Sequence, residues 1–269
     1  MFPVRPFASR PWFLVPVLAA LSLIAAAVFS GAIHAAPQNS QPTVPPPGTP
    51  PVLPPQQQLI HQGKLIFDYT PQYAAQWTGN TLTCTDCHRL SGTADYASPM
   101  IDVAGLFPMF SKRAGHVITL QNRIQECFVR SENGKPLPTN SPEMKALVAY
   151  INSLWTNGVK NKPYKYRGLE PIPALTGNPT RGKLLYTTHC AACHQANGEG
   201  LPDAYPPVWG PNSYNDGAGM FNNANFAAWV QHNMPLQDPG ILTPQQAWDV
   251  AAYVNSQPRP KLNPAYKKY

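Results

Sequence analysis

The sequence predicts a mainly α-helical protein built from two small tandem domains. Three short segments occur in both halves: a Gly-Lys-Leu step, a pentapeptide Cys-x-x-Cys-His and an Ala-Tyr-x-Asn step. They lie at 63–65, 84–88 and 149–152 in the first half, and at 182–184, 190–194 and 252–255 in the second. Because their order is the same in both halves, the chain carries an internal duplication. Its 269 residues leave room for two domains of about 100 residues each.

Helical signals flank both pentapeptides. Gly63 and Gly182 are each followed one turn later by an aromatic residue, which indicates a helix packed closely against a neighbour. Residues 142–155 and 244–257 each start with a proline that follows a Ser or Thr able to cap a helix. Each half is therefore expected to run helix, pentapeptide, loop, helix.

These repeats, and the composition of what surrounds them, predict the organisation of the chain. The expected parts are a signal peptide or N-terminal anchor at 1–36, a proline-rich linker at 37–58, a first domain at 59–156, an interdomain linker at 157–178, a second domain at 179–257 and a tail at 258–269. Residues 1–10 carry Arg5 and Arg10 and no acid, and an apolar run follows, as in secretory signals. We expect export to the periplasm; a retained apolar run would anchor the protein to the membrane.

The net charge of +7 and a pI near 9.2 raise the question of nucleic-acid binding. However, charged residues make up only 12% of the chain, and no Lys/Arg runs with interleaved aromatic residues occur. An exported protein of this kind is expected to have no nucleic-acid partner. Small anionic substrates or an acidic redox partner fit the charge better.

Each pentapeptide is the attachment signature of c-type haem. Two cysteine thiols form thioethers with the porphyrin, and the histidine that follows binds iron. A disulfide, a redox dithiol or half a zinc site would not need a histidine after each cysteine pair. The sequence thus predicts two covalently bound haem c groups, held by Cys84, Cys87 and His88 and by Cys190, Cys193 and His194.

The second axial ligand of each iron should come from the segment between pentapeptide and last helix. In the second half Met234 lies 40 residues after His194 and directly before a proline, the usual setting of a methionine ligand in cytochromes c. A thioether favours ferrous iron and raises the reduction potential. Met220 is the competing ligand, and a core methionine is the non-functional interpretation.

The first half has Cys127 in the corresponding place, 39 residues after His88. Residues 119–132 are predicted to be helical, which places Arg123 and Arg130 one turn to either side of this cysteine. Two guanidinium groups should favour its thiolate, the form that binds iron and attacks sulfur. A buried inert thiol is the alternative, with Met109 and Met144 as fallback ligands.

The layout around both motifs resembles class I cytochrome c domains, in which the first and last helices cross over the haem. A closer resemblance is carried by residues 107–115 and 119–138, where Cys127, its arginines and an Arg-Ser-x-Asn-Gly-Lys run are combined. This combination is similar to the thiosulfate dehydrogenases, periplasmic dihaem cytochromes c with His/Cys ligation at the first haem. The fold class implied is two tandem class I cytochrome c domains.

The resemblance also implies a site and a reaction. Arg113, Arg123, Ser131 and, with less support, Lys135 correspond to the family's substrate site beside Cys127. Two thiosulfate ions would couple to tetrathionate, with electrons leaving through haem 2 to a soluble or membrane-bound cytochrome, and the same site could run in reverse. Some family members carry a lysine that can replace the methionine ligand of haem 2; here Asn233 precedes Met234, so such a switch is not expected.

Two other functions compete with this one. A dihaem electron carrier of the c4 type predicts His/Met ligation at both haems, which an optical spectrum distinguishes from thiolate ligation. A sulfur-oxidation cytochrome that ligates thiosulfate to a carrier protein would show no thiosulfate-dependent reduction of ferricyanide by itself.

Overall fold

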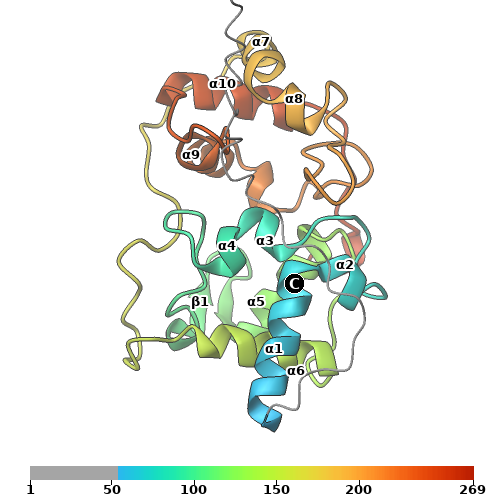
Figure 1. Ribbon diagram of the computed structural model, residues 1–269, viewed down its shortest axis with the longest axis vertical. Helices are drawn as coiled ribbons and strands as arrows, with labels where there is room; N and C mark the ends of the chain where they lie inside the picture. Colours follow the sequence, from blue (N-terminus) through green and yellow to red (C-terminus); the bar gives the residue numbers. More distant parts are fainter. Residues whose placement is uncertain (1–53) are drawn as a thin grey trace, which may run out of the picture. The chain divides into compact units, whose positions relative to one another are not determined.

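The computed structural model describes residues 54–269, which form helices joined by long loops and one short hairpin (Figure 1). The helices are α1 (Pro55–Asp68), α2 (Thr70–Tyr73), α3 (Cys84–Cys87), α4 (Arg89–Gly92), α5 (Leu120–Arg130), α6 (Pro142–Ser153), α7 (Pro179–His189), α8 (Ala191–His194), α9 (Asn223–Asn233) and α10 (Pro244–Asn255), with 3-10 turns at Ala104–Leu106, Gly219–Phe221 and Pro264–Tyr266. Strands β1 (Met109–Ser111) and β2 (His116–Ile118) pair antiparallel.

In the first half, α1 crosses α6, and the two lie side by side in Figure 1. The crossing depends on Gly63, because a Cβ atom at this position would lie 2.0 Å from the Ala146 carbonyl oxygen. The backbones can approach this closely only where a side chain is missing. The prediction of close packing at this glycine is confirmed.

The second half repeats the crossing with α7 and α10. A Cβ atom at Gly182 would lie 1.9 Å from the Asp249 carbonyl oxygen. Beside this contact the Arg181 guanidinium donates two hydrogen bonds, of 2.6 and 2.8 Å, to the Asp249 carboxylate. The duplication seen in the sequence is therefore a duplication of one helix crossing.

The predicted helix starts agree with the caps. Thr119, Ser141 and Thr243 each accept a hydrogen bond from a backbone N–H in the first turn of α5, α6 and α10. The three helices end two residues before the predicted ends at 132, 155 and 257.

Two clusters of buried hydrophobic residues lie under these crossings. The first contains Phe67, Phe128 and Leu147, and the second contains Tyr186, Trp229 and Val250. Leu82, which precedes the first pentapeptide, packs in the second cluster, so the two halves share part of their core.

The flanking segments differ partly from the predictions. Residues 1–53, and with them the predicted signal or anchor and most of the proline-rich linker, lie outside the described residues. Helix α1 begins at Pro55, inside the predicted linker, because proline is compatible with a first helical turn. The predicted tail at 258–269 is fixed to the second half, since Leu262 N–H donates to the Asp216 carboxylate. From residue 54 onward no helix is both long and apolar enough to cross a membrane.

Candidate haem and substrate site

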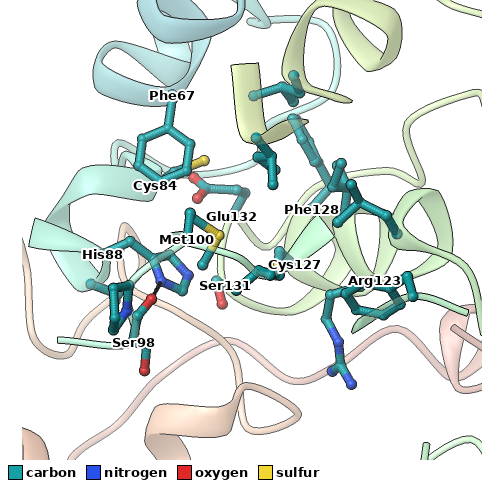
Figure 2. A pocket seen from close by; sticks show the side chains of 18 of the residues that line it. Phe67, Cys84, His88, Ser98, Met100, Arg123, Cys127, Phe128, Ser131 and Glu132 are labelled. Atoms are coloured by element: carbon teal, nitrogen blue, oxygen red, sulfur yellow. Dashed lines mark hydrogen bonds between the residues drawn. The ribbon is translucent and has the colours of Figure 1, made fainter. Parts of the chain in front are cut away.

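A cavity of about 320 Å³ lies beside the first pentapeptide (Figure 2). Its walls are mostly apolar and include Leu106, Phe128 and Leu147. The polar and sulfur-bearing residues that line it lie in or near α3 and α5, on β1 and in the segment between the halves: Thr83, Cys84, Cys87, His88, Ser98, Met100, Met109, Arg123, Cys127, Ser131, Glu132 and Arg167. The fold therefore brings the first haem motif and Cys127, far apart in sequence, to one cavity.

Local hydrogen bonds fix the two thiols of the first motif. Thr83 and Asp86 form a reciprocal capping box at the start of α3. The N–H of Cys84 donates to Thr70 Oγ1 at 3.1 Å, and Thr70 belongs to α2 in the segment that the second half lacks. None of the cysteines in the described part of the chain forms a disulfide, so the thiols of both pentapeptides are available for thioether formation.

Both motif histidines are oriented by a backbone carbonyl. His88 Nδ1 lies 2.6 Å from the Ser98 oxygen, and His194 Nδ1 lies 2.8 Å from the Pro206 oxygen. Burial lowers the pKa of each imidazole, and the carbonyl contact only partly opposes this. Neutral imidazoles that donate from Nδ1 present Nε2 as the lone-pair nitrogen, as in metal-bound histidines.

Besides the two motif cysteines, three sulfur-bearing residues line this cavity: Met100, Met109 and Cys127. Met144, named as a fallback ligand, is 1% exposed, packs in the hydrophobic core and is not among the residues that line the cavity. Met100 lies between the first pentapeptide and the last helix but was not named as a candidate ligand, because it follows His88 by only 12 residues, whereas Met234 follows His194 by 40.

The charges around Cys127 differ from those predicted. Burial raises the pKa of its thiol to about 11; Arg123 and Arg113 lower it, while Glu126 and Glu132 raise it. Arg130, expected to flank the thiol, instead donates hydrogen bonds to the carbonyl oxygens of Gly217 and Tyr269, at 3.0 and 2.5 Å. The expectation that the polypeptide alone favours the thiolate is wrong, because burial outweighs the charges of Arg123, which lines the cavity, and Arg113, which does not.

Arg113 and Arg123 are held by one buried carboxylate. Glu126 Oε2 lies 2.5 Å from Arg123 Nη1 and 3.6 Å from Arg113 Nη1. The Glu126 side chain is 3% exposed, whereas those of the two arginines are 40% and 35% exposed. The trio carries one net positive charge, with guanidinium N–H groups left for a ligand. Its sequence signal was the i, i+3 spacing of Arg123 and Glu126 on a helix.

Ser131 and Lys135 have different surroundings. Ser131 lines the cavity one turn after Cys127, and its carbonyl accepts a hydrogen bond from Asn80. Lys135 is exposed and is not among the lining residues. Glu132, not singled out in the sequence, is 2% exposed and lines the cavity, and burial and then the charge of Asp86 raise its pKa well above the usual value.

At the second motif, Cys190, Ala191, Met220 and Met234 pack against one hydrophobic cluster. Both candidate methionines for haem 2 therefore pack against the same cluster as a cysteine of the second motif. Met234 follows directly on α9, whose last residue, Asn233, is 3% exposed.

Hydrogen bonds connect the first motif to α9 of the second half. Trp229 Nε1 on α9 donates to the carbonyl oxygen of Cys87 at 2.9 Å. Arg89 Nη1 donates to Asn233 Oδ1 at 3.2 Å. The residue after one predicted iron ligand, His88, thus contacts the residue before the other, Met234, and the position held by lysine in some relatives is occupied here by a buried amide.

Comparison with protein families agrees with this arrangement. The model described as SoxA/TsdA, cytochrome c domain, matches residues 71–160, and the model described as cytochrome c matches residues 179–258. A thiosulfate dehydrogenase of Allochromatium vinosum is 38% identical over 212 residues, which cover 75% of this chain and 78% of that protein. The chain belongs to the thiosulfate dehydrogenase family. Members of this family are oxidoreductases, and the chain is an enzyme of this class.

Other thiosulfate dehydrogenases are also similar to this chain over most of its length. A thiosulfate dehydrogenase of Stutzerimonas stutzeri is 35% identical over 210 residues, 76% of this chain and 68% of that protein. Among solved structures, thiosulfate dehydrogenase (TsdBA) from Marichromatium purpuratum matches with a TM-score of 0.74 and 38% identity, over 81% of this chain. This chain spans 50% of that longer chain.

The predicted fold class and cofactors are confirmed: two cytochrome c domains, each with one covalently bound haem c. The residues present fit the group. Both motifs offer two thiols that are not in disulfides and a histidine held through Nδ1, and an apolar cavity lies beside the first. Cys84, Cys87 and His88 would hold haem 1, and Cys190, Cys193 and His194 would hold haem 2.

Proposed function

We propose that this protein oxidises two thiosulfate ions to tetrathionate in the cavity of haem 1 and passes two electrons through haem 2 to an external cytochrome in the periplasm. The observation that carries the proposal is the sharing of one cavity by Cys127, Arg123, Ser131 and the first haem motif. The family relationship supports the substrate, because its curated members are named for thiosulfate.

Electrostatics explains why such a site needs arginines. Two dianions about 5 Å apart repel each other by about 3 kcal/mol even in bulk water, and more where water is excluded. Arg123 and Arg113 bring planar donors that match sulfonate oxygens. Glu126 holds both guanidinium groups and removes one unit of charge, so it acts as a positioning residue for them. Ser131 is proposed as a neutral donor.

Cys127 is the proposed nucleophile, and its sulfur would also bind the iron of haem 1. When bound, the haem groups supply two one-electron acceptors and, at haem 1, an iron that stabilises the Cys127 thiolate. The thiolate sulfur bonds to the outer sulfur of one thiosulfate, and two electrons leave. The outer sulfur of a second thiosulfate then attacks this Cys–S–S bond, which releases tetrathionate and restores the thiolate. Atoms and charge balance over the two steps, and no proton is consumed.

Met234 is the proposed second ligand of haem 2. A neutral thioether gives a higher potential than a thiolate, so electrons are expected to move from haem 1 to haem 2. The Trp229 contact with Cys87 supports electron transfer between the halves, because it joins α9 of the second half to the first haem motif.

The test compares Cys127→Ala with Met100→Leu, each with both haems loaded. We expect Cys127→Ala to lose thiosulfate-dependent ferricyanide reduction and also the weak near-infrared charge-transfer band of a thiolate-ligated ferric haem. Met100→Leu removes another sulfur from the same cavity and should keep both. Normal turnover by Cys127→Ala protein, or loss of the band only in Met100→Leu, contradicts the proposal.

Product analysis distinguishes the remaining alternatives. Tetrathionate formed in proportion to ferricyanide reduced supports coupling of two thiosulfates, whereas activity only with an added carrier protein indicates ligation to that carrier. Reduction of tetrathionate by the chemically reduced protein measures the reverse reaction at the same site.

A further inference from the structure

Arg259 in the second half is held by contacts that leave two nitrogens of its guanidinium group without a hydrogen-bond acceptor. Arg259 follows α10, and its Nη2 donates to the Val254 carbonyl oxygen at 2.7 Å. The guanidinium carbon lies 4.3 Å from the centroid of the Tyr214 ring and 5.5 Å from that of Phe221. These contacts fix the plane of the group.

The other two nitrogens of Arg259, Nε and Nη1, donate no hydrogen bond within the described part of the chain, although the side chain is close enough to the Tyr214 hydroxyl to oppose the rise in its pKa that burial causes. Nε and Nη1 are both buried, so water does not replace the missing acceptor at the protein surface. The ion pairs found among residues 54–269 involve other cations. A buried cation without a counter-charge is costly, and an anion that accepts from both nitrogens removes this cost.

The surroundings of Arg259 indicate where the anion comes from. Tyr214 belongs to the hydrophobic cluster against which Cys190, Met220 and Met234 pack. The Tyr214 hydroxyl donates to Asn255 Oδ1 at 2.9 Å, and Asn255 Nδ2 donates to the Met220 carbonyl oxygen at 3.1 Å. Arg259 is thus linked through Tyr214 and Asn255 to the Met220 segment, and it covers a tyrosine of the cluster against which Cys190 and Met234 also pack.

We propose that Nε and Nη1 of Arg259 bind a propionate carboxylate of haem 2. A carboxylate offers two oxygens to the fork of a guanidinium group, and haem c carries two such carboxylates next to its ring. The positive charge stabilises the reduced iron relative to the oxidised iron, so Arg259 raises the potential of haem 2. The inference rests on the presence of haem 2 and not on the identity of the substrate.

The experiment uses the full protein with both haems attached, in three variants. Arg259→Gln removes the charge, Arg259→Lys keeps the charge without the fork, and Lys261→Gln removes an equal charge two residues away on the surface, where the side chain is 82% exposed. Haem content per chain shows that each variant is loaded. Spectropotentiometric titration then gives the potentials of both haems, and resonance Raman spectra give the propionate bending bands.

In Arg259→Gln we expect one of the two potentials to fall, by about a tenfold change in its reduction equilibrium or ~59 mV for one electron, together with a shifted propionate band. Arg259→Lys should restore most of the potential but not the band. A Met234→His variant identifies the haem 2 component, because only that haem should change with it. Lys261→Gln should resemble the wild type.

Two results overturn the proposal. The first is an unchanged propionate band in loaded Arg259→Gln protein, which would mean that a water or a free anion occupies the position. The second is a fall in potential no larger than that of Lys261→Gln, which would mean that Arg259 acts only as a distant charge. If Arg259→Gln does not load haem 2, the loaded Arg259→Lys protein decides through its propionate band.

Discussion

Arg123→Gln tests the electrostatic part of the proposed mechanism. Arg113, Arg123 and Glu126 together carry one net positive charge. The substitution removes the cation of Arg123, so that the remaining pair of Arg113 and Glu126 has no net charge. Because Glu126 is buried, its carboxylate stays in place and faces the incoming dianion with only one partner. Substrate binding should therefore weaken.

The magnitude follows from the exposure of the arginine. Its side chain is 35% exposed, so water screens its charge and the bulk dielectric constant is the appropriate limit. A unit charge and a dianion about 4 Å apart then attract by about 2 kcal/mol. Loss of this term lowers kcat/KM for thiosulfate roughly 30-fold, and the effect should shrink as salt is added.

The assay is ferricyanide reduction by loaded protein at several thiosulfate concentrations and two ionic strengths. Lys112→Gln is the matched control, because it removes an equal charge from an exposed side chain next to Arg113. Arg123→Lys should recover part of the loss, since it restores the charge without the planar fork. If kcat/KM of Arg123→Gln stays within about threefold of Lys112→Gln, the guanidinium clamp is refuted.

Two further predictions concern the helix crossing of the second half. Gly182→Ala would place a methyl group 1.9 Å from the Asp249 carbonyl oxygen, so its free energy of unfolding should fall by about 1–3 kcal/mol in thermal or urea unfolding. Lys183→Ala on the same helix is the control and should not show this loss. Equal stability of the two variants would contradict the crossing. For Asp249, burial by itself would raise the pKa, but hydrogen bonds from Arg181, the Asn178 N–H and Gln245 lower it below 3.8 overall. Because the pKa of Asp249 is lower in the folded state than in the unfolded state, its ionised carboxylate stabilises the fold above pH 3.8. This stabilisation is lost as the pH falls through the pKa of the folded state. Asp249→Asn should therefore be less stable than wild type at neutral pH, and the gap in unfolding midpoint should close in acid; a gap independent of pH would contradict this.

The helices and the attachment sites of the cofactors could be predicted from the sequence because they depend on local patterns of residues. A cap such as Thr119 or Ser141 marks a helix start by the hydrogen bonds it makes within four residues. The glycines at 63 and 182 marked the crossings because each stands one turn before an aromatic residue. Thioether attachment needs only two thiols and a histidine at fixed spacing.

The charges around Cys127 were harder to predict from the sequence, because the partner of a side chain can lie far from it along the chain. Helical spacing placed Arg130 on the same face as Cys127, but its guanidinium binds carbonyl groups of the second half, at Gly217 and Tyr269. The rise in the Cys127 pKa comes first from burial, which spacing does not reveal. Met100 lines the cavity from the loop after α4, and its spacing from His88 does not reveal this position.

The sequence by itself determined that this protein is helical, duplicated and built around two haem c groups, because short covalent and hydrogen-bonding patterns specify each of these. Only the tertiary structure decided which groups surround Cys127, how Glu126 joins two arginines, and how Trp229 and Arg89 connect the first haem motif to α9. Those contacts join residues from different parts of the chain, and both their geometry and the electrostatics of burial exist only once the chain has packed.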